Sequence, residues 1–169
     1  MASITNFISN FNGGTRKNRF IVTATWPSDV VSRITTYHIQ SATMPPSIIG
    51  TIAIPYRGRE AYYAGDRQYA PWDIVILDDT GNKSLWHPFH QWHKLINKHY
   101  ENTHSFSNDS FRSAKTNWIV EHLDLNGNPI KEIELVGCWP MSVTPISFNM
   151  NSNVYNSFGV RLSYDYFRG

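Results

Sequence analysis

The last stretch of the chain before its C-terminus alternates strictly between apolar and polar side chains. The apolar positions are Phe158, Val160, Leu162, Tyr164 and Tyr166, and the polar positions between them are Ser157, Gly159, Arg161, Ser163 and Asp165. Because successive side chains of a β-strand point to opposite faces, this period of two predicts a strand with one buried and one wetted face. We therefore expect a sheet protein.

A β-hairpin is expected just upstream, between candidate strands at Asn117–Leu125 and Ile130–Val136. The Asn-Gly-Asn-Pro segment at 126–129 favours chain reversal between them. Trp139 and Pro140 should end the second strand, because proline cannot donate to a strand ladder. From Ile130 to Phe167 the sequence shows no residue pattern suited to catalysis.

The first half of the chain contains four further extended segments. Arg19–Trp26 and Ile34–Gln40 read as strands, and we expect them to form a hairpin around Pro27, Ser28 and Asp29. Ile48–Pro55 is predicted to be extended and to lead into a long hairpin or excursion over Tyr56–Tyr69, in which Gly65-Asp66-Arg67 would form a tight turn. Asp73–Leu77 reads as a short buried strand.

One helix is predicted, over Lys83–His99. An apolar stripe at helical spacing carries this prediction, and its members are Leu85, Phe89, Trp92 and Ile96. The segment Glu101–Lys115 reads as a loop. Residues 1–18 are expected to be a flexible or contact arm, and the chain of 169 residues most simply forms one domain over 1–169.

Composition excludes several classes of function. A formal charge of +2 leaves no basic surface for tight binding of nucleic acid. No apolar run is long enough to cross a membrane, and the N-terminus does not resemble a secretion signal. The single cysteine, Cys138, cannot form an intramolecular disulfide and favours assembly in a reducing compartment.

Residues that could carry chemistry are better explained by structure. His87, His90 and His93 recur every third residue, so they drift around a helix and do not converge on a metal. The carboxylate pairs Asp78 with Asp79 and Glu132 with Glu134 lack any sign of a pocket that would perturb their pKa values. Cys138 should be a buried, inert thiol. We expect no catalytic residue, metal or cofactor.

The order of several short motifs is more specific than any one of them. In chain order they are Tyr56-Arg57-Gly58-Arg59, Gly65-Asp66-Arg67, Trp72-Asp73-Ile74-Val75, the helix containing Trp92, Lys131-Glu132-Ile133-Glu134-Leu135, Gly137-Cys138-Trp139-Pro140 and Tyr164-Asp165-Tyr166-Phe167. This series, from about Phe20 to Phe167, resembles the tail tube proteins of contractile-tailed, T4-like bacteriophages.

The resemblance implies a mainly β, antiparallel β-sandwich or barrel subunit with one flanking α-helix. Such subunits form stacked hexameric rings whose sheets join into a continuous β-barrel, the conduit for double-stranded DNA during ejection. A contractile sheath surrounds the tube, and baseplate tube-initiator proteins start it. The resemblance thus implies a structural virion protein, without enzyme activity, specific DNA binding or membrane contact, that is assembled in the bacterial host cytoplasm.

Residues can be proposed for each surface of such a tube. Ring or subunit contacts are expected at Tyr56, Arg57, Arg59, Asp66 and Arg67. The sheath would meet Lys83, Lys94 and Lys98. The polar phase of the C-terminal strands would face the lumen through Glu132, Glu134, Ser157, Arg161, Ser163 and Asp165.

Two alternatives remain open at this point. A baseplate tube-initiator or tail-completion protein would share the fold but would stop growing, whereas a tube protein should form long stacks. A carbohydrate-binding β-sandwich would use exposed Trp and Tyr side chains to stack on sugars, and it would bind glycans as a stable monomer.

Overall fold

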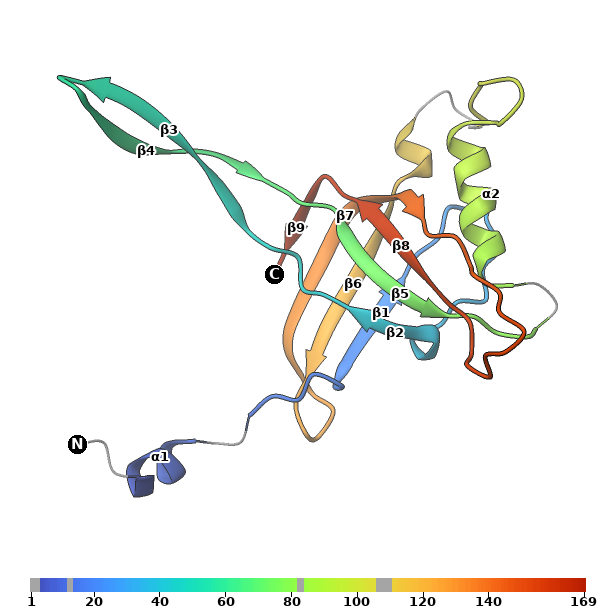
Figure 1. Cartoon of the computed structure of the whole chain (residues 1–169), viewed down its shortest axis with the longest axis horizontal. Helices are drawn as coiled ribbons and strands as arrows, with labels where there is room; N and C mark the ends of the chain where they lie inside the picture. The colour runs from blue at the N-terminus through green and yellow to red at the C-terminus, as the bar shows by residue number, and fades with distance from the viewer. Residues whose placement is uncertain (1–3, 12–13, 82–83, 106–110) are drawn as a thin grey trace.

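The computed structural model describes residues 4–11, 14–81, 84–105 and 111–169 (Figure 1). Its helices are α1 (Ile4–Asn10) and α2 (Trp86–Ile96), with 3-10 turns η1 (Thr36–His38) and η2 (Phe111–Ala114). The strands are β1 (Phe20–Ala24), β2 (Ile39–Ala42), β3 (Ile48–Tyr56), β4 (Arg59–Gln68), β5 (Trp72–Leu77), β6 (Thr116–Leu123), β7 (Pro129–Val143), β8 (Ser157–Ser163) and β9 (Tyr166–Arg168). The mainly β, antiparallel prediction with one flanking helix is confirmed, and α1 is a second, short helix.

The main sheet has the strand order β1-β6-β7-β8-β5-β2, and β9 also pairs with β7. All of these pairs are antiparallel. The strands β3 and β4 form a separate ribbon that extends away from the sheet (Figure 1). The fold therefore consists of a sheet body and a projecting hairpin.

The core lies between α2 and one face of the sheet. Three residues of the predicted stripe, Leu85, Phe89 and Trp92, are buried on this side of the core. Ile96 is only partly buried, and its neighbour Leu95 is buried instead. Trp26 is partly buried and packs against this core, with its ring centroid 4.9 Å from that of Phe89 and 5.7 Å from that of Trp118. Aromatic rings at these separations bury large apolar areas and hold the helix on the sheet.

The alternation of buried apolar and more exposed polar side chains holds through β8 and continues to Tyr164, which is also buried. Phe158, Val160 and Leu162 are buried and point to the core. After Ser163 the chain leaves its alignment with β8, and β9 pairs with a different part of β7. The single strand predicted to reach Tyr166 is therefore wrong, because the backbone N–H of Asp165 donates to Val136 O (2.9 Å) and turns the chain across β7.

Three other expectations about the strands are also wrong. The expected hairpin between the first two strands does not form, because β1 pairs with β6 while β2 pairs with β5. The strand β7 continues through Trp139 and Pro140, where a register irregularity after Pro140 accommodates the missing N–H. The segment Gly65-Asp66-Arg67 lies inside β4 rather than in a turn.

The turn of the ribbon is instead at Arg57 and Gly58. Their φ angles are 48° and 78°, and the paired residues Tyr56 and Arg59 flank them. Two positive φ values in a two-residue loop are typical of a type I′ turn, whose twist matches that of the strands. Gly65 lies close to Gly50 on the other strand. A Cβ atom on residue 65 would be 3.2 Å from the Gly50 carbonyl oxygen, so the two strands approach closely at this point.

Candidate assembly surfaces

The β3–β4 hairpin exposes many large apolar side chains to solvent. Its exposed apolar side chains are Ile48, Ile49, Ile52, Ile54, Tyr56, Tyr62 and Tyr63. A two-stranded hairpin has no core of its own and is marginally stable in water. Because large exposed apolar patches mark interaction sites, this surface is suited to contact with another protein.

The predicted ring-contact residues lie at the two ends of this hairpin. Tyr56, Arg57 and Arg59 are exposed at its tip, where the Arg57 guanidinium lies 5.3 Å from the centroid of the Tyr56 ring. Asp66 and Arg67 are exposed near its base, beside the irregular pairing at Ile49 and Thr51. The structure does not bring the two groups together. The isoleucines between them were not named as contacts, although their alternation in Ile48–Tyr56 is visible in the sequence.

The face of the sheet opposite to α2 is polar and carries compensated charges. Arg161 on β8 is directly opposite Asp73 on β5, and two hydrogen bonds join them, Nε to Oδ1 at 2.7 Å and the second guanidinium nitrogen to Oδ2 at 3.0 Å. The hydrogen bonds from Arg161 lower the pKa of Asp73 below its usual value. Sequence reasoning found Arg161 but missed Asp73, because only the register shows that the two residues are neighbours.

The remaining lumen candidates occupy three places on or near this face. Glu134 accepts a hydrogen bond from Asn117 Nδ2 (2.8 Å), and Glu132 lies directly opposite Glu121 on β6. Ser157 and Ser163 are at the two ends of β8. Asp165 lies apart from the β8 row, in the break before β9, where Lys115 Nζ approaches its Oδ1 to 2.6 Å.

One of the three predicted sheath-facing lysines lies on the surface of α2. Lys94 is exposed in the last turn. Lys98 lies beyond the end of the helix, which is shorter than predicted, and its Nζ is 2.8 Å from Glu101 Oε2. Lys83 lies outside the described residues. Only Lys94 is therefore placed as a lysine on the helix surface.

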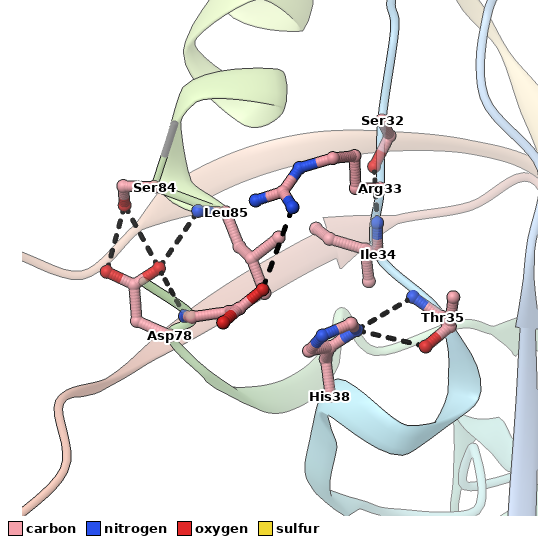
Figure 2. Close-up of polar contacts among 9 residues, drawn as sticks. Ser32, Arg33, Ile34, Thr35, His38, Asp78, Ser84 and Leu85 are labelled. Carbon is pink, nitrogen blue, oxygen red and sulfur yellow. Dashed lines mark hydrogen bonds and ion pairs between the residues drawn. The ribbon is translucent and has the colours of Figure 1, made fainter. Parts of the chain in front are cut away.

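An aspartate upstream of α2 binds the backbone N–H of Leu85, the N-cap residue of the helix. Asp78 Oδ1 accepts hydrogen bonds from the backbone N–H of Leu85 (2.9 Å) and of Asp79 (3.0 Å), while Ser84 Oγ donates to Oδ2 (2.9 Å) (Figure 2). A side-chain oxygen in this position stabilises a helix start. Arg33 NH1 lies 3.7 Å from Asp79 Oδ2, so the segment before η1 is also linked to the residues that lead into α2.

The histidines of α2 are not equivalent. His90 stacks on Trp86, with centroids 4.7 Å apart, and lies 5.2 Å from His99. His93 is half-buried rather than solvated, and its Nε2 lies 3.1 Å from the Pro140 carbonyl oxygen. Burial lowers the pKa of His93, although the hydrogen bond to Pro140 raises it in part. Among the described residues no three His, Cys, Asp or Glu side chains are grouped to hold a metal.

These surfaces belong to a fold that is found in known proteins. Residues 62–168, more than half of the chain, match the family model described as T4-like virus tail tube protein gp19. The chain belongs to this family. The prediction of a structural tail tube protein of a contractile phage tail, which is a virion component and not an enzyme, is confirmed.

A sequence relative agrees with membership of the tail tube family, and solved structures share the fold. The tail tube protein of Serratia phage KSP90 is 28% identical over 97% of this chain and 95% of its own length. A chain of the anti-feeding prophage baseplate structure superposes with a TM-score of 0.68 at 13% identity, covering 94% of this chain and 96% of that chain. A chain of the PVC extracellular contractile injection system sheath–tube complex gives a TM-score of 0.60 at 15% identity, covering 99% and 97%. At these identities the two solved structures show the shared fold.

The lone cysteine fits a structural protein of this family. Cys138 is fully buried, with its Sγ 3.5 Å from the Leu135 carbonyl oxygen. Burial raises the pKa of its thiol to about 12. Since the thiolate is the reactive form of cysteine, this residue is inert at neutral pH, as predicted. No helix among the described residues is both long and apolar enough to span a membrane.

Proposed function

We propose that this tail tube protein assembles into six-membered rings that stack into the inner tube of a contractile phage tail. The observation that carries the proposal is the apolar β3–β4 hairpin, whose isoleucines are exposed in the single chain. An apolar ribbon of this kind is costly in water and becomes stable when a neighbour covers it. In a tube, each subunit has further copies of the same chain beside it, and one of these copies would cover the hairpin.

The edges of the main sheet offer a second kind of contact. Within the chain β1 and β2 are its outermost strands (Figure 1). Unpaired strand edges lead to uncontrolled association unless they are covered, and closing several sheets into one barrel removes them. We infer that neighbouring copies in a ring join through these edges, so that their sheets form a continuous β-barrel.

The polar face of the sheet is proposed to line the channel for double-stranded DNA. It lies opposite to α2. Its cation Arg161 is paired with Asp73, and Glu134 accepts a hydrogen bond from the neutral amide of Asn117. A wall without free cations does not retain phosphates, because each phosphate contact made by Lys or Arg adds affinity. Glu132, Ser157 and Ser163 add polar but non-cationic groups to this face.

Addition of one positive charge tests this assignment of the channel. Ser157→Lys should make assembled tubes retain short duplex DNA at low salt, and the retention should disappear as salt is raised. Tyr100→Lys, at a fully exposed position outside the polar sheet face, adds the same charge and should leave DNA retention unchanged. Equal retention by the two variants would contradict the assignment of the polar face to the channel.

The helix side of the subunit is proposed to face the contractile sheath. If the polar sheet face lines the lumen, α2 lies on the outside of the tube (Figure 1). Lys94, Lys98 and Lys83 would then offer weak, reversible contacts to acidic groups of the sheath. Replacing the three lysines by glutamate should weaken sheath attachment and leave tube formation intact, whereas unchanged attachment would refute this role.

The proposed tube contact itself is tested by a charge placed on the hairpin. Ile54→Asp puts a carboxylate where an apolar contact is expected, and the concentration needed for assembly should rise by about tenfold or more. Leu125→Asp is a matched control, because Leu125 is exposed to a similar degree, 54% against 48% for Ile54, in the β6–β7 turn. Assembly of Ile54→Asp at the wild-type concentration would overturn the role of the hairpin.

Assembly of this tube is proposed to start on baseplate initiator proteins in the cytoplasm of the bacterial host. The lone reduced cysteine is compatible with that compartment. The chain as a whole, residues 1–169, would act as a single tube domain with residues 1–18 as its contact arm.

A further inference from the structure

The short helix α1 presents an apolar stripe that its own chain leaves uncovered. Ile4, Phe7, Ile8 and Phe11 follow the i, i+3, i+4, i+7 pattern of one helix face, and they are 75%, 63%, 68% and 54% exposed. No residue of α1 is buried, and the helix lies away from the sheet body (Figure 1). This pattern is the one with which amphipathic helices bind in grooves of other proteins.

A helix of this length requires such a contact to be stable. Isolated helices shorter than about 12 residues are marginal in water, because the first turn is costly to nucleate. The segment Ile4–Asn10 also has no charged side chain that would interact with its ends. Phe7 stacks on Phe11, the residue just beyond the helix, with ring centroids 5.2 Å apart. An apolar, uncharged surface is the partner that suits this stripe.

One face of the β3–β4 hairpin has these properties. Ile52 pairs with Tyr63 and Ile54 pairs with Ala61, so these four side chains share one face of the ribbon. Glu60 lies on the opposite face, where its carboxylate accepts a hydrogen bond from the Tyr62 hydroxyl (2.7 Å). The Ile52 face is thus the uncharged side of the middle of the hairpin.

The spacing of apolar side chains on the two elements is also compatible. Residues four apart on a helix, such as Ile4 and Ile8 or Phe7 and Phe11, are separated by about 6 Å along the axis. Residues two apart on a strand, such as Ile52 and Ile54, are separated by about 6.8 Å. A helix lying along the ribbon can therefore place two successive layers of its stripe against two successive pairs of the hairpin.

We propose that α1 of one copy docks lengthwise on the Ile52 face of the β3–β4 hairpin of a neighbouring copy. This inference rests on the proposed self-assembly, and it adds the arm, the receiving face and their orientation. The segment between Asn10 and Phe20 spans at most about 35 Å when extended, which lets α1 reach past the sheet body. Both elements project from the body at separate places, where a neighbour can meet each of them (Figure 1).

Disulfide trapping between two differently tagged chains tests the proposal. One chain carries Ile8→Cys and the other carries Ile54→Cys, so a linked pair bearing both tags can arise only between copies. Cys138 adds no background, because it is buried and unreactive. Asn6→Cys replaces Ile8→Cys in the control, since Asn6 lies on the side of α1 opposite to the stripe. A disulfide requires Cβ atoms about 4 Å apart, so the pairing reports direct contact.

Oxidation of assembled tubes should give at least about tenfold more mixed-tag dimer from Ile8→Cys than from Asn6→Cys. A tenfold ratio corresponds to the free energy gained by burying one apolar side chain. Tubes that form without this dimer would overturn the docking and leave the tube function standing. Failure of the unmodified chain to form tubes would overturn the proposed function, and the docking with it.

A chain that carries both cysteines separates docking between copies from docking within one copy. Below the assembly concentration it should remain unlinked. An internal disulfide at that concentration would overturn the proposal, because α1 would then contact its own hairpin.

Assembly of charged variants gives an independent measurement. Ile8→Asp should raise the concentration needed for assembly about tenfold, and Asn6→Asp, which adds the same charge on the other side of α1, should change it less than about twofold. Both variants should keep the circular dichroism and melting profile of the wild type, because α1 contributes nothing to the core. Equal effects of the two substitutions would contradict docking through the apolar stripe.

Discussion

Gly137 allows β7 and the C-terminal segment to approach each other closely. Its φ angle of 73° is strained for other residues, and a Cβ atom there would collide with the Asp165 carboxylate. Lys115 holds that carboxylate in place through its Nζ, 2.6 Å from Oδ1. Backbone strain and steric conflict therefore act together at this position.

Alanine substitutions at two glycines separate backbone strain from the steric conflict with Asp165. Gly137→Ala should lower the free energy of unfolding by about 2–3 kcal/mol, of which about 1–2 kcal/mol is backbone strain. Gly127→Ala, at φ 89° with no atom near the new Cβ, should cost only the strain. Urea unfolding of the unassembled protein measures both, and equal losses would show that Asp165 moves aside freely.

His93 makes the stability of the subunit depend on pH. Burial lowers its pKa below the usual 6.5, so the unfolded chain binds a proton more readily than the folded one. Stability should therefore be complete above about pH 6.5 and fall as the pH decreases below that value. The lowered pKa of His90, caused first by burial, acts in the same direction.

Substitution of His93 isolates this contribution. In the variant His93→Gln the new amide side chain can still donate a hydrogen bond to the Pro140 carbonyl, but it does not titrate. Urea unfolding at about pH 7.5 and about pH 5.5 should show a smaller loss for the variant than for the wild type. The same loss in both proteins would assign the acid sensitivity to other groups, since Asp73 contributes only below its ordinary pKa of 3.8.

At the scale of elements, α2 depends on a cap that comes from outside the helix. Asp78→Ala removes the acceptor for the Leu85 N–H and for Ser84 Oγ and should cost about 1 kcal/mol of stability. Asp79→Ala removes only a partly exposed ion pair with Arg33 and should cost less. Thermal unfolding of the two variants compares them directly, and a larger loss for Asp79→Ala would contradict the capping role.

Elements with strong local patterns were predictable from the sequence, and their partners were not. The stripe of Leu85, Phe89 and Trp92 indicated α2, since helical periodicity depends only on neighbouring positions. The pairing of β1 with β6 depends on residues far apart in the chain, and nothing in Arg19–Trp26 indicates it. The prediction of a hairpin around Pro27 was wrong for that reason.

On the candidate surfaces, too, local patterns were predictable from the sequence and spatial partners were not. The turn at Arg57 was missed because a non-glycine residue adopts positive φ there, and Gly65 attracted the turn prediction instead. The polar phase of β8 was recognised, but Asp73 could be named as the partner of Arg161 only from the strand register. The isoleucines of the hairpin were visible as an extended segment, and their lack of a partner required the structure.

At the scale of the whole molecule, the subunit has three surfaces with different chemistry. The polar sheet face carries paired charges, the helix side carries lysine and histidine, and the hairpin and α1 carry exposed apolar side chains. This division suits a protein that has DNA on one side, a sheath on the other and copies of itself between them. A baseplate initiator would share the fold but would not form long stacks.

Electron microscopy of the purified, tag-free chain at increasing concentration tests the central claim most directly. We predict long hollow filaments with six-fold symmetry in cross-section, in which the polar sheet face lines the lumen and the β3–β4 hairpin is ordered against a neighbouring copy. Single rings that never stack, or monomers that persist when baseplate initiator is supplied, would contradict the account.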